Sequence, residues 1–121
     1  MAGSNGHKEK RKFSRFFMDW PLEYRMLDVP HAYGGIVVDG SEVGLRIHSI
    51  KNMPIGTKLN IAVIFPEGFQ MTNFDVLAEI IWKDLYYEED HNGYQYGLRF
   101  IQIKEEDFQK LKQLLAEELR M

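Results

Sequence analysis

Residues 59–65 read LNIAVIF, and this stretch decides the fold class. Leucine, isoleucine, valine and phenylalanine stand at every second position, with Asn60 and Ala62 among the residues between them. A period of two is typical of a β-strand that buries one face on a core, whereas a helix repeats its apolar positions every three to four residues. The pattern therefore predicts a strand over residues 57–66.

Short runs rich in valine, isoleucine, tyrosine and phenylalanine continue on both sides of this strand. Segments 74–89 and 94–103 flank Asn92-Gly93, a dipeptide that suits the tight turn of a β-hairpin. We expect these two segments to pair antiparallel. Residues that favour turns separate the other runs, at residues 28–30, 34–35, 52–56 and 66–68.

The end of the chain has a different period. Acidic residues stand at positions 105–107, where they favour the first turn of a helix. The apolar positions that follow have the three-or-four spacing of an amphipathic helix: Phe108, Leu111, Leu114, Leu115 and Leu119. The sequence predicts a helix over residues 105–120. Together with the strands it predicts an all-β (β+α) fold, a closed or nearly closed antiparallel β-barrel with the C-terminal helix over one open end.

One domain is expected, because 121 residues of which 45% are hydrophobic supply one compact core. We interpret the small and polar residues 1–9 as a flexible leader and residues 10–121 as the domain.

The chain has no cysteine, which excludes disulfides, Cys-ligated zinc and thiol catalysis. No stretch reaches the roughly 18 apolar residues of a membrane span, and no signal peptide is visible. We therefore expect a soluble, cytoplasmic protein.

Positive charge is concentrated near the N-terminus. Residues 8–15 hold five basic residues and one acidic residue, Glu9, and so carry a charge of +4. Because the net charge of the whole chain is −3, the other residues together carry −7. A general nucleic-acid or membrane surface would spread its basic residues over a whole face. The asymmetry favours a small anion that is met by a basic arm at residues 10–16.

Two short patterns lie about two dozen residues apart. Arg11 and Arg15 form an RxxxR pattern, and residues 39–44, DGSEVG, form a DxSxxG pattern. A strand expected over residues 17–27 lies between them, and the hairpin follows. Two further landmarks come later, an apolar strand that ends in Trp82 and the run YGLRF at residues 96–100.

In this order, the landmarks of residues 8–103 resemble those of the PilZ domain family of cyclic di-GMP receptors. The resemblance implies a six-stranded antiparallel barrel with a C-terminal helix, and a bacterial receptor that is not an enzyme. It also implies that the protein changes conformation on binding its ligand and signals to a protein partner in motility, exopolysaccharide or virulence control. Lys12 and Val43 depart from common family residues without breaking either pattern.

The chemistry of the ligand fits these residue types. An arginine can donate two hydrogen bonds to guanine O6 and N7, stack on a base or hold a phosphate, so Arg11 and Arg15 are expected contacts. Ionised Asp39 can accept the guanine N1–H and N2–H edge, and the Ser41 hydroxyl can bond a phosphate or the base. Gly44 would let the backbone approach closely.

Secondary contacts are expected from Lys10, Lys12 and Trp82. An indole that stacks on guanine contributes about 1–3 kcal/mol, but a tryptophan at the end of an apolar strand can equally belong to the core or the barrel mouth. The resemblance implies that the residue before RxxxR, here Lys10, influences whether one nucleotide or a pair binds, and it favours the pair.

Other interpretations remain open. Residues 39–41 can form a turn as well as a site. The four histidines show no metal-ligand spacing and no nucleophile elbow is present, so neither a cofactor nor a metal nor catalysis is expected. A ligand-independent interaction module of the same fold and a small oligonucleotide-binding barrel are the alternatives. The acidic remainder of the chain argues against DNA as a partner, and no membrane insertion is expected.

Overall fold

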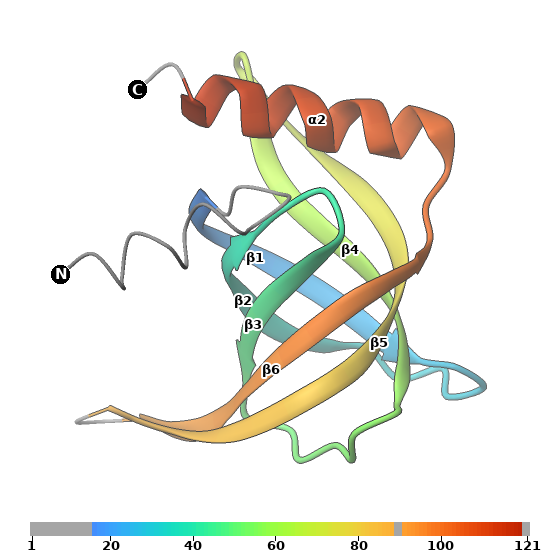
Figure 1. Cartoon of the computed structure of the whole chain (residues 1–121), viewed down its shortest axis with the longest axis vertical. Coiled ribbons are helices and arrows are strands. Elements are labelled where there is room, and N and C mark those ends of the chain that lie inside the picture. The colour runs from blue at the N-terminus through green and yellow to red at the C-terminus, as the bar shows by residue number, and fades with distance from the viewer. Residues whose placement is uncertain (1–15, 89–90, 120–121) are drawn as a thin grey trace, which may run out of the picture.

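The computed structural model describes residues 16–88 and 91–119. The strands form a closed barrel in the order β1-β2-β3-β6-β5-β4, and all neighbours pair antiparallel. The helix lies across one end of the barrel (Figure 1). The predicted fold class is therefore confirmed. The elements are β1 (Phe16–Met26), β2 (Tyr33–Gly40), β3 (Gly44–Ser49), β4 (Lys58–Glu67), β5 (Gln70–Glu88), β6 (His91–Gln102) and α2 (Glu105–Leu119).

The strand predicted over residues 57–66 is β4. The alternating apolar residues of β4 are buried: Leu59, Ile61, Val63 and Phe65 are each at most 2% exposed. These side chains point into the barrel, while Asn60 points to solvent. β4 pairs with β1 on one side and with β5 on the other, and the pairing with β1 closes the barrel.

The β5–β6 hairpin is confirmed, but its predicted turn at Asn92-Gly93 is wrong. Both residues lie within β6, opposite residues 86–87 of β5. The pairing continues as far as Glu88 and His91, and residues 89–90 between them lie outside the described residues. Gly93 serves a close approach instead, because a Cβ at this position would lie 3.0 Å from the backbone oxygen of Ser49.

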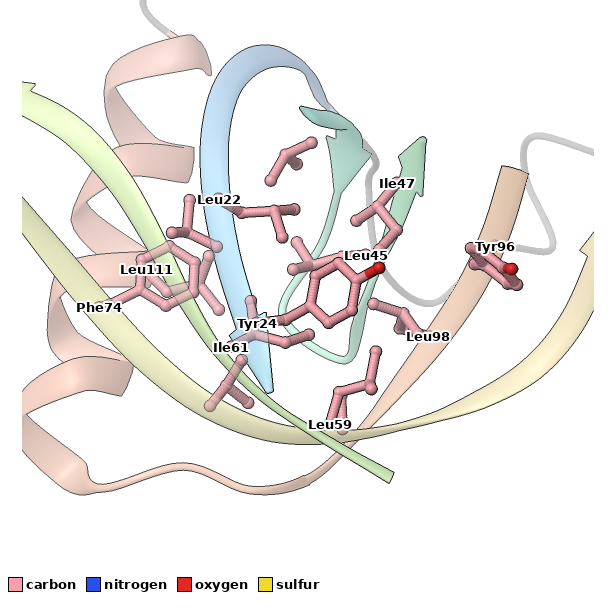
Figure 2. Packing of buried hydrophobic residues seen from close by; sticks show 14 of the residues in the cluster. Leu22, Tyr24, Leu45, Ile47, Leu59, Ile61, Phe74, Tyr96, Leu98 and Leu111 are labelled. Carbon is pink, nitrogen blue, oxygen red and sulfur yellow. The ribbon is translucent and has the colours of Figure 1, made fainter. Parts of the chain in front are cut away.

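The predicted helix is confirmed as α2, which covers the barrel end. Leu111 is fully buried, and Figure 2 shows it beside Phe74 of β5. Leu114 and Leu115 are also buried, so the apolar stripe of the helix completes the core that the strands leave open. Among the described residues, no helix is long and apolar enough to cross a membrane.

Two buried tyrosines hold the opposite end of the barrel. The Tyr24 hydroxyl lies 2.7 Å from the Ser49 hydroxyl, and the Tyr96 hydroxyl donates to the backbone oxygen of Lys51 at 2.5 Å. The same Tyr96 oxygen accepts the N–H of Met53 at 2.8 Å. Burial raises the pKa of both tyrosines above the ordinary value of 10.0, against the lowering effect of Ser49 on Tyr24 and of the Met53 N–H on Tyr96.

Leu111→Ala should lower the free energy of unfolding by about 2–5 kcal/mol, because it removes a fully buried side chain from the contact between the helix and the barrel. Urea unfolding followed by circular dichroism measures the change. Gln113→Ala on the exposed side of the same helix is the control and should stay within about 0.5 kcal/mol of the parent. Equal losses for the two variants would contradict the assigned packing.

Candidate functional site

Four residues form one line across the outside of the barrel. Asp39 of β2 pairs with Arg46 of β3, Arg46 pairs with Gly97 of β6, and Gly97 pairs with Trp82 of β5. Residues directly opposite each other in antiparallel strands share a face of the sheet. Both chain neighbours of Arg46 are buried in the core, so this line faces outward. We call these four residues the outer row.

A local irregularity in β2 turns Asp39 outward. Val37 points into the core and is fully buried, so strict alternation would point Asp39 inward as well. The pairing register with β3 shifts between these two residues, as in a β-bulge, and Asp39 therefore lies opposite the outward Arg46. Bulges of this kind re-aim a side chain without interrupting the sheet.

Asp39 is held by an ion pair. Its side chain is 6% exposed, and Arg46 Nη2 donates to Asp39 Oδ2 at 2.5 Å. The Arg46 side chain is 32% exposed, so one side of the pair faces solvent. Arg46 Nε is buried without a hydrogen-bond partner in the part of the chain that the structure describes. The row thus presents a carboxylate that has at least one of its two oxygens, Oδ2, engaged by an arginine.

Ser41 lies in the turn between β2 and β3, at the end of the barrel that carries α2 (Figure 1). Its N–H donates to the backbone oxygen of Gly44 at 2.9 Å, and its hydroxyl accepts the N–H of Val43 at 3.3 Å. The turn interpretation of this segment is therefore correct. A hydroxyl that accepts one bond still has its own proton to donate, although Ser41 is only 1% exposed in this structure.

Gly44 is required by the approach of two strands. A Cβ at this position would lie 2.2 Å from the backbone oxygen of Leu98 on β6, a distance that no side chain can tolerate. The sequence interpretation assigned this glycine to the approach of a ligand. The structure gives it a neighbour within the barrel, where it allows β3 and β6 to pair beside the turn.

Trp82 lies on the outside of the barrel. The register between β5 and β6 shifts between Ile80 and Trp82, so Ile80 is buried while Trp82 is 39% exposed. The indole lies over Gly97, because a Cβ at Gly97 would fall 1.9 Å from the indole Nε1. This arrangement excludes a core role for Trp82 and leaves an aromatic surface at the end of the outer row.

Sequence reasoning missed three side chains on this part of the molecule. Arg46 and His48 alternate with the buried residues of β3, and that alternation was the signal that could have placed them outside. His48 stacks on Tyr86 of β5, with ring centroids 3.7 Å apart. No local motif marks these contacts, because each of them joins residues of different strands.

The remaining predicted residues are Lys10, Arg11, Lys12 and Arg15, which lie outside the described residues, as does the predicted leader over residues 1–9. The described chain begins beside the outer row, since Phe17 pairs with Asp39. No group of three or more His, Cys, Asp or Glu side chains that could hold a metal occurs within residues 16–88 and 91–119.

A separate groove of about 510 Å³ lies along β1, β4 and β5, with Ala62 on its wall. Charges of both signs surround it, including Arg25, Asp75 and Lys104, and Asp107 of α2 closes one side. Of the predicted site residues that the structure describes, none lines this groove. The candidate site is therefore the outer row and the adjoining turn, both of which lie outside this groove.

Gly97→Ala should displace the Trp82 indole, because the new Cβ would occupy the position of the ring. In a Trp20→Phe background Trp82 is the only tryptophan, and its fluorescence emission should shift to longer wavelength as the ring becomes more exposed. Gly34→Ala is the matched control, since its Cβ would have no atom closer than 4.0 Å. An unchanged emission spectrum for the Gly97 variant would contradict the assigned position of the indole.

Gly44→Ala should lower the thermal unfolding temperature in the absence of any ligand, because β3 and β6 must separate to admit the methyl group. The expected loss is about 1–3 kcal/mol, as for other overpacked sites. Differential scanning calorimetry of the free protein measures it. A variant as stable as the parent would show that the role of Gly44 lies outside the packing of the two strands.

Comparison with known proteins identifies the architecture. A family model described as "PilZ domain" matches residues 9–117. The PilZ domain of YcgR from Escherichia coli, solved with c-di-GMP, superimposes with a TM-score of 0.69 at 15% identity, over 92% of this chain and 92% of that one. No curated protein matched the chain.

Two longer proteins share the fold. The motility inhibitor MotI of Bacillus subtilis has a TM-score of 0.72 at 14% identity, and 92% of this chain covers 52% of it. MrkH of K. pneumonia, described as a c-di-GMP-dependent transcription regulatory factor, has a TM-score of 0.71 at 14% identity, with 89% and 50% covered. This chain therefore spans about half the length of MotI and MrkH. With its six-stranded closed barrel, its C-terminal helix and a match over nearly its whole length, this chain belongs to the PilZ domain family.

Proposed function

We propose that this chain is a receptor for cyclic di-GMP and that it acts by binding rather than by catalysis. The observation that carries the proposal is the outer row, which places a buried carboxylate and an exposed indole on one face although they come from different halves of the sequence. The YcgR PilZ domain, which has the same fold, was solved with c-di-GMP.

Guanine recognition is assigned to the fixed part of the site. The Asp39 carboxylate can accept the N1–H and N2–H donors of a guanine edge, and its burial strengthens such bonds by excluding water. The Ser41 hydroxyl lies two residues further along, in a turn that fixes its position. The Trp82 indole supplies an aromatic surface on which a base can stack.

Phosphate recognition is assigned to the basic segment. Arg11 and Arg15 supply planar guanidinium groups that can clamp phosphates or donate to guanine O6 and N7, and Lys10 and Lys12 add charge. This segment directly precedes β1, and β1 begins beside Asp39. The connection supports a site in which residues 10–16 close over a nucleotide held on the barrel.

Signalling is assigned to the surface that changes when the basic segment closes. The ligand contributes the contacts that order this segment, and a protein partner then recognises the new surface. The controlled process in this proposal is motility, exopolysaccharide production or virulence, in a bacterial cytoplasm. A motility inhibitor that shares the fold supports the first of these. No cofactor is required by this scheme.

Isothermal titration calorimetry should show binding of cyclic di-GMP and negligible heat with GMP or cyclic di-AMP. Arg15→Ala and Asp39→Asn should each weaken binding by about 10- to 100-fold, because each removes hydrogen bonds to or from a charged group. The stoichiometry of the titration separates a single nucleotide from the expected pair.

Arg25→Ala is the matched control for loss of a cation. Arg25 lies on β1, 55% exposed beside Glu23, and it lines the separate groove. Its replacement should leave the affinity unchanged. Absence of heat with cyclic di-GMP would leave a ligand-independent interaction module, and a gel shift with single-stranded DNA or RNA would instead favour an oligonucleotide-binding barrel.

A further inference from the structure

The Asp39–Arg46 ion pair occupies the carboxylate that the proposed ligand needs. Arg46 Nη2 donates to Asp39 Oδ2 at 2.5 Å, and only 6% of the Asp39 side chain is exposed. The N1–H and N2–H donors of a guanine edge take one carboxylate oxygen each, so a guanine on Asp39 needs Oδ2 as well as the second oxygen. Ligand and Arg46 therefore compete for Asp39 Oδ2.

The two competitors are chemically alike. A guanidinium group presents N–H donors on nitrogens that share one carbon atom, and the N1–H and N2–H donors of guanine sit on the same N–C–N arrangement. Adenine has no hydrogen at N1 and no amino group at C2. Of the two purines, only guanine can take over the bond from Arg46 Nη2 to Asp39 Oδ2 and place a second donor on the same carboxylate.

The existing pair is incompletely satisfied. Arg46 Nε is buried and has no hydrogen-bond partner within the described ranges, and a buried donor without a partner destabilises the arrangement that holds it. The Arg46 side chain is nevertheless 32% exposed, so the guanidinium can leave toward solvent without crossing the core. A pair with one buried donor unpaired and an open exit is suited to displacement.

We propose that Arg46 is a resident substitute for the guanine edge, which a guanine of the ligand displaces from Asp39 on binding. The inference rests on the proposed function and adds the regulation of its site. In the free protein, Arg46 keeps the buried carboxylate paired. In the complex, guanine takes the carboxylate and the Arg46 guanidinium moves away from it, so a ligand without the guanine donors meets a site that is already filled.

The sign of a double-mutant cycle tests this exchange. The affinity for cyclic di-GMP is measured by calorimetry, at one pH and ionic strength, for the parent and for the Asp39→Asn, Arg46→Met and doubly substituted proteins. In the parent, the gain of the guanine contact is offset by the loss of the ion pair. In the Arg46→Met background nothing is offset, so Asp39→Asn should weaken binding by a factor about tenfold larger than it does in the parent.

A positioning role for Arg46 gives the opposite sign. If Arg46 stays on Asp39 in the complex and orients it, Asp39→Asn should cost less once Arg46 is gone. An equal or smaller loss in the Arg46→Met background therefore overturns the exchange while leaving the proposed function intact. Absence of binding by the parent protein overturns both.

Arg99 provides the matched control for removal of an arginine. It lies on β6 two residues from Gly97, is 58% exposed and pairs with Glu79 at 2.7 Å, so it does not engage Asp39. In an Arg99→Met background, Asp39→Asn should weaken binding by the same factor as in the parent. Arg46→Gln removes the charge but keeps a polar side chain at this partly exposed position, so it provides a folded alternative if Arg46→Met does not fold, and Asp39→Asn should again cost more in its background than in the parent.

Discussion

Two single-residue register shifts determine which chemistry this barrel presents to solvent. One lies in β2 before Asp39 and the other in β5 before Trp82. Without them, strict alternation would send a carboxylate and an indole into a core made of aliphatic and aromatic side chains, where an unpaired carboxylate costs several kcal/mol. The shifts reconcile a continuous sheet with a polar outer face, and the candidate site exists only because both occur.

The fold could be predicted from the sequence because its signals are local. The period of two in residues 59–65 and the three-or-four spacing in the last helix each report burial along one element. The predicted position of the hairpin turn was wrong because Asn92-Gly93 has the residue types of a tight turn. Gly93 is instead required by the close approach of Ser49 on β3. Cross-strand packing overrode a local preference.

The site was predicted less completely than the fold. Asp39 and Ser41 could be named from a motif, and the structure places them at a strand end and in the turn that follows. Arg46 could not be named, because its importance comes from its pairing partner on another strand. The close contacts of Gly44 and Gly97 likewise depend on residues more than ten positions away, which no local pattern reveals.

At the end of the barrel opposite α2, the Tyr96 hydroxyl holds the connection between β3 and β4 against the core through two hydrogen bonds. The amide of Met53 lies in this connection, yet it is buried and donates to a hydroxyl that is itself anchored in the core. An amide in such a position opens only when the barrel opens, so the connection belongs to the same cooperative folding unit as the strands. The barrel is therefore closed by hydrogen bonds at one end and by a helix at the other, and both closures belong to the folding unit that the strands form.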